Sequence, residues 1–363
     1  MTNETIAAKK PRLGWLDALR GFTMILVVTN HVALKSFGMQ IRWSAALQFF
    51  LLFRMPLFFF ISGFLAYKAS RLWDARTLRE LSLKKMRVQL IPTIVFFLLY
   101  LAMIPSAPFL DSLQEALASG MKAGYWFTLV LLYMLLTYYL FSYVESKCLP
   151  RCLSWIPITF LFVVSLCLFE TCYLPRYFSW ALGYKGEPNA FMNYTSLVEM
   201  IRYFPFFLFG TMVHRYWDWA QRLMDSSWFF PVVTVLAVVC TLEVIVWHNL
   251  RLAWASLPHT LAMFLLLSVV FMFFRYYHDF FEQTRFGLSL QFIGRRTLDI
   301  YLLHYFFLPK LPMVGEFFRV NRHNFILDTT ASLAIALLVV AFCVLASNIL
   351  RVSPFLKKYL FGR

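Results

Sequence analysis

Ten stretches of mainly apolar residues divide this sequence, and most approach the length that a helix needs to cross a lipid bilayer, about 20 predominantly apolar residues. Apolar residues make up 61% of the 363 residues and charged residues only 14%, which excludes an ordinary soluble domain. The sequence therefore predicts one all-α domain over residues 1–363, a polytopic membrane bundle of about ten transmembrane helices, and nine or eleven spans stay compatible with the pattern. The apolar windows cover residues 15–35, 44–67, 88–104, 126–145, 156–173, 197–213, 227–247, 253–274, 292–309 and 326–350.

Positive charge is distributed unevenly between the connecting segments. Lys and Arg number 34 against 18 Asp and Glu, and the chain also has 41 Phe, 18 Tyr and 11 Trp, which indicates membrane lipid and not nucleic acid as a partner. With the N-terminus inside, the inner segments hold 22 Lys and Arg and the outer loops nine. Because cytoplasmic loops carry the excess of Lys and Arg, both termini are expected in the cytoplasm. Residues 1–12 then form a short basic N-terminus ahead of a retained first span.

The densest basic segment, residues 68–87, lies between the second and third windows and has the apolar spacing of a short interfacial helix. One interpretation is an anchor on anionic lipid that fixes the topology. The other is a surface that holds the phosphates of a cytoplasmic nucleotide ligand, since Arg and Lys are the side chains that bind phosphate. Composition alone leaves both interpretations open.

Arg20 and His31 are ionisable groups inside the first window, where each needs a partner or a function. Eleven residues separate them, which at 100° per residue is within about 20° of a whole number of turns, so both are expected on the same face and about 16 Å apart along the axis. Asp17 is one turn from Arg20 and can pair with it. Alternatively, Arg20 is a snorkelling interface residue and His31 marks the outer end of the span.

Other ionisable groups lie within later windows. Glu199 and Arg202 are three residues apart, so they can pair on one helix face. His304 and Tyr301 belong to an apolar run near residue 300, where a structural role is the simpler interpretation. The six cysteines form no CxxC pair and have no metal-like histidine spacing, so neither a disulfide nor a metal site is expected.

The segment RLGWLDALRGFTMILVVTNH at residues 12–31 has an arginine, ten residues and then a histidine behind an LDALRG-like start. Together with five later segments in the same order, it resembles the membrane-bound acyltransferase-3 family. Gly124 departs from the pattern, because many members carry a histidine there, which puts in doubt the acceptor contact made by that histidine. The further matches are MPLFFFISGFLAYK (55–68), KKMRVQLIP (84–92), WFTLVLLY (126–133), PFFLFGTMV (205–213) and GRRTLDIYLLH (294–304).

The resemblance implies an O-acyltransferase in the cytoplasmic membrane of a bacterium. Such enzymes move an acyl group, often acetyl, from cytoplasmic acyl-coenzyme A (acyl-CoA) to a sugar or lipid-linked glycan hydroxyl across the membrane. His31 matches the catalytic histidine, and a neutral imidazole can take the proton of the attacking hydroxyl. An acyl-histidine intermediate would use the same residue. Succinyl remains an alternative to acetyl, and the acceptor is left open.

The same resemblance assigns the donor side. Arg20 matches the motif arginine and is assigned to catalysis, where it would hold part of the donor or stabilise charge on the thioester oxygen. Arg87, with Lys84 and Lys85, is the candidate for the coenzyme A phosphates. Two further residues are candidates for donor contact, with helix packing through small side chains as the favoured alternative, namely Ser62 and Gly63.

On the acceptor side, Trp126 could stack on a sugar, although an aromatic belt at the interface explains it equally simply. Glu199, Arg202 and Arg54 are candidates for the acceptor path. The longest outer loop, residues 174–196, has aromatic residues, Asn and Gly that suit a carbohydrate-facing surface. Supporting positions around the catalytic pair are assigned to Asp17, His304 and Tyr301.

Two rival functions remain. A transporter or flippase would use the same buried charges without covalent chemistry, but the chain has no internal repeats and no matched Gly/Pro-interrupted spans. A structural membrane protein would tolerate replacement of His31 and Arg20. Consumption of a thioester that depends on His31 separates the acyltransferase from both.

Overall fold

The computed structural model describes residues 13–40, 44–69, 71–105, 107–148, 155–173, 190–247, 257–321, 325–354, 356 and 360. Regular structure in these ranges is helical, with no strand among them. The helices are α1 (Gly14–His31), α2 (Ala45–Ala66), α3 (Ala75–Lys85), α4 (Ile91–Met103), α5 (Phe109–Ala118), α6 (Trp126–Cys148), α7 (Trp155–Tyr173), α9 (Ala190–Thr195), α10 (Leu197–Arg215), α11 (Trp217–Met224), α12 (Phe229–Leu242), α13 (Leu257–Tyr276), α14 (His278–Gln283), α15 (Arg285–Gly294), α16 (Thr297–Phe307), α17 (Pro312–Val320) and α18 (Phe325–Leu350).

The all-helical class predicted from the sequence is confirmed, and every apolar window contains helix. By length and composition, five helices of the described chain can cross a membrane, or six if the pair α11 and α12, bent by 82°, is one span. Neither α1 nor α10 is among them, because the polar and ionisable side chains described below lie on these two helices. The count of about ten spans and the cytoplasmic termini therefore stay predictions. The five are Leu47–Ala66, Ala75–Met103, Trp126–Cys148, Pro258–Tyr276 and Phe325–Leu350.

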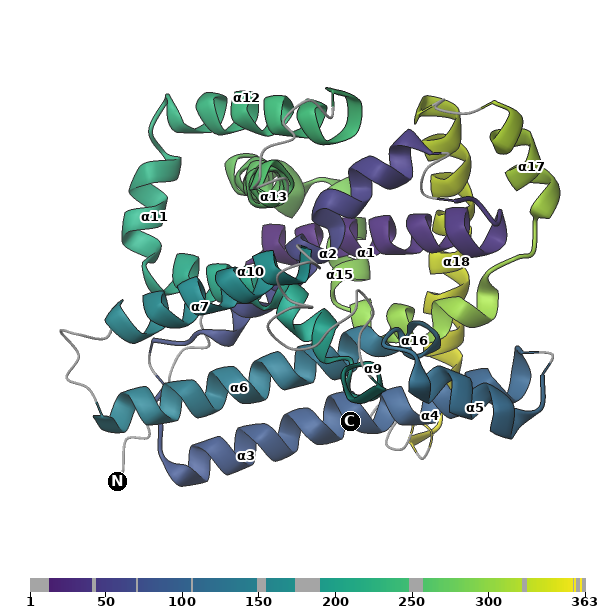
Figure 1. Ribbon diagram of the computed structural model, residues 1–363, viewed down its shortest axis with the longest axis horizontal. Coiled ribbons are helices and arrows are strands. Elements are labelled where there is room, and N and C mark those ends of the chain that lie inside the picture. The colour runs from purple at the N-terminus through teal and green to yellow at the C-terminus, as the bar shows by residue number, and fades with distance from the viewer. Residues whose placement is uncertain are drawn as a thin grey trace.

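Two segments differ from the sequence-based expectation. The basic segment does not form a separate interfacial helix, because α3 continues through a π-helical turn at Met86–Leu90 into α4 as one long helix along α6 (Figure 1). The ninth window, residues 292–309, is not one span, since α15 ends at Gly294 and α16 begins at Thr297. The N-terminus 1–12 and most of the outer loop, residues 174–189, lie outside the described residues.

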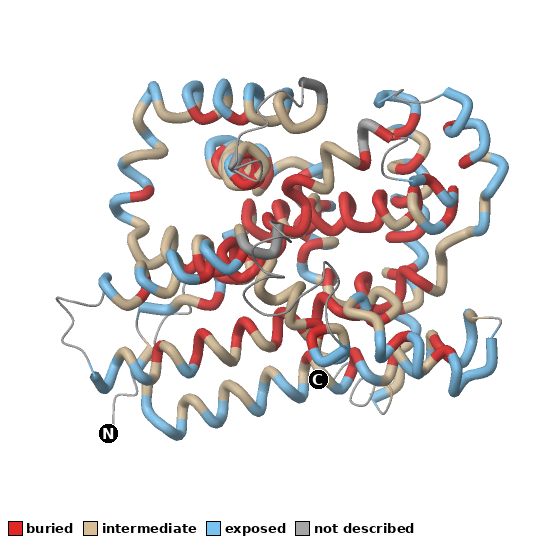
Figure 2. The backbone as a smooth tube through the Cα atoms, in the orientation of Figure 1, coloured by how far each residue is buried: buried red, intermediate tan, exposed pale blue. Residues whose placement is uncertain are grey.

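Helix α1 runs through the centre of the molecule, and most of its residues are buried (Figures 1 and 2). One face of α1 lies along α16. At one end of this contact Arg20 donates to the hydroxyl of Thr297 (2.9 Å), and at the other His31 lies beside Tyr305. The prediction that Arg20 and His31 share a face is therefore confirmed. In turn, α16 is tied to α18 by the ion pair of Asp299 with Arg351.

Helices α2 and α10 cross in backbone contact through glycines. A Cβ atom added to Gly63 would lie 1.9 Å from the carbonyl oxygen of Phe207, and one added to Gly210 would lie 2.0 Å from that of Phe60. No side chain fits in either place, so glycine is required for the helices to come this close. The packing role therefore accounts for Gly63.

Helices α1 and α15 cross in the same way. A Cβ on Gly21 would lie 2.0 Å from the carbonyl oxygen of Leu290, and one on Gly294 would lie 1.8 Å from that of Asp17. Gly21 directly follows Arg20, so this crossing fixes the position of that arginine relative to α15 and the start of α16.

Candidate active site

His31 ends α1 and is half buried beside two residues of α16. Its Nε2 lies 3.4 Å from the hydroxyl oxygen of Tyr305, and its ring centroid is 5.1 Å from that of His304. The Nδ1 atom of His31 is buried and has no hydrogen-bond partner among the described residues. A buried imidazole nitrogen without a hydrogen bond raises the free energy of the folded protein, so its presence calls for a functional explanation.

His304 is fully buried beneath His31. Its Nδ1 lies 2.7 Å from the carbonyl oxygen of Tyr301, and since a carbonyl only accepts, Nδ1 carries the hydrogen. The Nε2 atom of His304 is then an unprotonated acceptor in the neutral ring, and no described group donates a hydrogen bond to it. The structure thus places the predicted supporting residue His304 directly next to His31.

A cavity of about 560 Å³, here called the histidine cavity, opens beside His31. It brings together the four residues predicted for the acceptor side, which come from α2 (Arg54), α6 (Trp126) and α10 (Glu199 and Arg202). Its polar and aromatic lining residues include Asn30, His31, Gln48, Arg54, Trp126, Glu199, Arg202, Tyr203, His259 and Tyr301.

Contacts within the histidine cavity refine the sequence-based assignments. Glu199 and Arg202 form the expected i, i+3 ion pair, with a long separation of 4.0 Å. Trp126 is buried and stacks on Tyr203, with centroids 5.6 Å apart and planes 23° apart. It therefore belongs to the interior of the protein, where its remaining surface faces the cavity.

A second cavity of about 460 Å³, here called the basic cavity, lies at the Arg20 end of α1. Five Lys and Arg side chains line it, and no carboxylate among the described residues does. Ser62 lines this cavity as well, and its hydroxyl donates to the carbonyl of Phe58 (2.8 Å). The charged lining residues are Arg20, Lys68, Arg71, Lys84 and Lys85.

The other residues predicted for the donor do not all lie at the basic cavity. Lys84 and Lys85 line the basic cavity, whereas Arg87 is exposed and does not line it. Gly63 lies at the crossing of α2 and α10, where it allows the two helices to pack closely. The predicted ion pair of Arg20 with Asp17 is present, with 3.5 Å between Nη1 of the arginine and Oδ1 of the aspartate. The arginine that lines the basic cavity therefore has one carboxylate partner.

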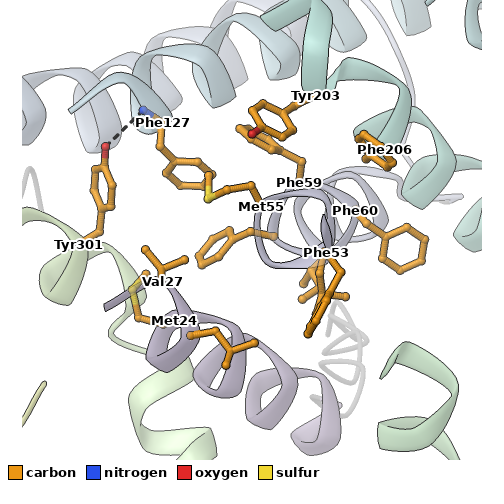
Figure 3. Packing of buried hydrophobic residues seen from close by; sticks show 14 of the residues in the cluster. Met24, Val27, Phe53, Met55, Phe59, Phe60, Phe127, Tyr203, Phe206 and Tyr301 are labelled. Atoms are coloured by element: carbon orange, nitrogen blue, oxygen red, sulfur yellow. Dashed lines mark hydrogen bonds between the residues drawn. The ribbon is translucent and has the colours of Figure 1, made fainter. Parts of the chain in front are cut away.

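Three aromatic side chains line both cavities and form the wall between them: Phe58, Phe127 and Tyr301. The ring of Phe127 lies 4.8 Å from that of Phe58 and 5.3 Å from that of Tyr301, centroid to centroid. The Tyr301 hydroxyl accepts from the backbone N–H of Phe127 (3.2 Å, Figure 3) and donates to the carbonyl of Gly124 (2.7 Å). Tyr301 is thus fixed in the wall by two hydrogen bonds.

Gly124 adopts φ +107°, a conformation that side-chain-bearing residues rarely take. A Cβ there would overlap the Tyr305 hydroxyl at 2.2 Å. Tyr305 therefore fills the space that a larger residue at position 124 would need. Sequence reasoning missed Tyr305, although it directly follows His304 in the YLLHY stretch.

Lys122 fixes the turn before Gly124. Its Nζ donates to the carbonyls of Leu117, Ser119 and Asn193 at 2.8, 2.7 and 2.6 Å, and burial lowers its pKa. These three bonds join the ends of α5 and α9 at the edge of the histidine cavity. No cluster of three or more metal-ligating side chains occurs in the described part of the chain.

The helical fold, with several helices long and apolar enough to cross a membrane, is that of a multi-pass membrane protein, and two interior cavities meet at a buried wall. A family model described as an acyltransferase domain matches residues 13–348, nearly the whole chain, and the protein belongs to this acyltransferase-3 family. An acyltransferase activity follows from that membership. No curated protein and no solved structure matches the chain.

Proposed function

We propose that the protein transfers an acyl group, most simply acetyl, from acyl-CoA to a hydroxyl of a sugar or lipid-linked glycan in a bacterial cytoplasmic membrane. The observation that carries the proposal is the pair of cavities with one shared wall. One cavity is lined by cations and the other holds a histidine with an unsatisfied nitrogen. Two reactants can therefore approach one wall from opposite sides.

The basic cavity suits the donor. Coenzyme A carries several phosphates, and five Lys and Arg side chains without a lining carboxylate would attract them. Arg20 lies here, about 16 Å along α1 from His31 by helix geometry, so holding the donor is the role that its position supports. Under the expected topology this cavity faces the cytoplasm, where acyl-CoA is found. Arg87 would bind phosphate only outside the cavity.

The histidine cavity suits the acceptor. His31 would take the proton of the acceptor hydroxyl as that oxygen attacks the thioester carbonyl carbon. The carbon–sulfur bond then breaks, the coenzyme A thiolate leaves, and the proton held by His31 returns to the sulfur. An acyl ester and free coenzyme A result. For this step, the end of the donor has to reach His31 past Phe58, Phe127 and Tyr301.

Binding and turnover of acetyl-CoA by the purified protein in detergent test the proposal. The intact chain should bind acetyl-CoA and release free thiol when an acceptor is supplied. A variant with Arg20→Ala should bind the donor more weakly, and one with His31→Ala should bind it normally but release no thiol. Absence of binding to the intact, folded protein would exclude acyl-CoA as the donor.

A further inference from the structure

Arg54 of α2 is a buried cation in the wall of the histidine cavity. Only 7% of the residue is exposed. Its two terminal nitrogens donate to the side-chain oxygen of Asn30 at 3.0 and 3.1 Å when the Asn30 amide is oriented with its oxygen toward them. The Nε atom of Arg54 has no hydrogen-bond partner in the part of the chain that the structure describes. Asn30 precedes His31, so α1 holds the guanidinium close to the catalytic candidate.

The charge of Arg54 is not compensated within the described chain. Other sheltered arginines have carboxylate partners: Arg215 pairs with Glu145 at 2.9 Å and Arg351 pairs with Asp299 at 2.7 Å. Arg54 makes no such ion pair with any described carboxylate. A buried charge without a counter-charge is unfavourable, and in a membrane protein it marks a functional position.

The other charged residues of the histidine cavity do not supply the missing counter-charge. Arg202 supplies a second guanidinium, and Glu199 is the single lining carboxylate among the described residues. Glu199 lies within ion-pair distance of Arg202, at 4.0 Å, and not of Arg54. The counter-charge that Arg54 lacks is therefore most simply brought by the molecule that enters the cavity.

We infer that the acceptor is an anionic sugar or glycan, whose carboxylate or phosphate contacts Arg54 while the hydroxyl to be acylated faces His31. This inference rests on the proposed function, since it names the class of acceptor for that site. Arg54 is then a specificity-determining residue. The cavity volume of about 560 Å³ lies within the range of small-molecule sites.

Two anions could be the partner of Arg54: the permanent carboxylate or phosphate of the acceptor, or the oxyanion that forms at the thioester carbonyl. The permanent anion explains the structure without substrate better. That oxyanion exists only during the reaction, whereas Arg54 is buried and lacks a counter-charge before any reaction begins. The two explanations make different predictions for a reaction without acceptor.

Binding of small sugars, measured by equilibrium dialysis without acyl-CoA, tests the inference directly. The probes are glucuronate, glucose 6-phosphate and neutral glucose. At least one anionic sugar should bind tenfold or more tightly than glucose, and Arg54→Gln should remove that preference because it removes a charge-assisted hydrogen bond. Arg54→Lys keeps the charge and should retain part of the preference. Arg222→Gln, an exposed arginine outside both cavities, serves as control.

Thiol release from acetyl-CoA in the absence of a sugar separates the two anions. If Arg54 binds the acceptor, Arg54→Gln should lower transfer to an anionic sugar much more than it lowers slow hydrolysis of the donor by water. If hydrolysis falls tenfold or more while sugar binding does not change, Arg54 serves the oxyanion and the inference is overturned. Equal or absent binding of the anionic sugars relative to glucose also overturns it. Anion binding without consumption of acetyl-CoA would instead contradict the proposed acyl transfer.

Unfolding is not the expected cause of lost sugar binding in Arg54→Gln, because this substitution removes an uncompensated charge from the interior. Such a substitution is expected to leave the thermal midpoint unchanged or to raise it. The intact protein, in contrast, should gain more thermal stability from an anionic sugar than from glucose at the same concentration.

Discussion

The hydroxyl of Tyr305 lies between His31 and Gly124, 3.4 Å from Nε2 of the histidine and 3.3 Å from the carbonyl oxygen of the glycine. One phenolic hydrogen cannot be donated to both. When Tyr305 donates to Gly124, Nε2 of His31 has to donate to Tyr305, which leaves Nδ1 as the basic nitrogen. The tyrosine therefore selects the tautomer of the candidate base.

Replacing Tyr305 with Phe should lower the rate of acyl transfer about three- to tenfold, the effect of losing one hydrogen bond of ordinary strength. Donor binding should not change, because Tyr305 does not line the basic cavity. Steady-state kinetics of thiol release with acetyl-CoA measure both quantities. An unchanged kcat would show that the tautomer of His31 is set by another group.

Replacing His31 with Ala should abolish transfer to the detection limit, since a positioned general base contributes about 10²- to 10⁴-fold. The matched control is His278→Ala, an exposed histidine at the start of α14. Both variants should elute from size-exclusion chromatography like the intact protein. Normal turnover by the His31 variant would contradict its assignment as the base.

Replacing Lys84 and Lys85 together with Ala should weaken binding of acetyl-CoA, and raising the salt concentration should reduce the difference from the intact protein. Both lysines line the basic cavity. Arg87→Ala tests the sequence-based assignment, and its effect is expected to be smaller because Arg87 is exposed outside the cavity. A larger effect of Arg87 would place the phosphates on the outer surface of the long helix.

Replacing Phe58 with Trp should reduce acyl transfer but leave the affinity for acetyl-CoA within about twofold. The larger ring narrows the wall between the cavities, whereas the cations of the basic cavity are untouched. Phe58→Tyr, which changes size much less, is the matched control. Isothermal titration and thiol release on the same preparations give the two values. Equal transfer by both variants would show that the donor reaches His31 by another route.

Replacing Gly63 with Ala should destabilise the protein strongly, because the added Cβ would lie 1.9 Å from the Phe207 carbonyl oxygen. The neighbouring Ser62→Ala should have little effect on stability, since its hydroxyl only donates to the carbonyl one turn back. Thermal unfolding in detergent compares them. If Gly63→Ala keeps its thermal midpoint but loses donor affinity, Gly63 contacts the donor as the sequence allowed.

Local periodicity predicts much of this fold. The helical class and the shared face of Arg20 and His31 follow from apolar windows and from the angle per residue. Continuity between helices could not be predicted in the same way. The π-helical turn at Met86–Leu90 keeps α3 and α4 in one helix, although hydropathy changes sharply there, and the break between Gly294 and Thr297 lies inside one apolar window.

The site was predictable where a motif lies within one helix and less so where distant helices meet. The shared face of Arg20 and His31 and the pairing of Glu199 with Arg202 could be predicted from spacing along a single helix, whereas the roles assigned to His31 and Arg20 came from the family resemblance. The contacts of Arg54 with Asn30 and of Tyr305 with His31 join separate helices, and nothing in a single sequence measures such distances. The exposure of Arg87 likewise depends on which face of the long helix meets α6.

The glycine crossings of α2 with α10 and of α1 with α15 have a kinetic consequence. Backbones that touch without intervening side chains resist sliding or separating, so the rigid rocking by which many carriers expose a site alternately to two compartments is opposed at both crossings. Under the proposed function, the end of the donor would then reach His31 through rotation of the rings of Phe58, Phe127 and Tyr301, while the helices that carry these rings stay in place.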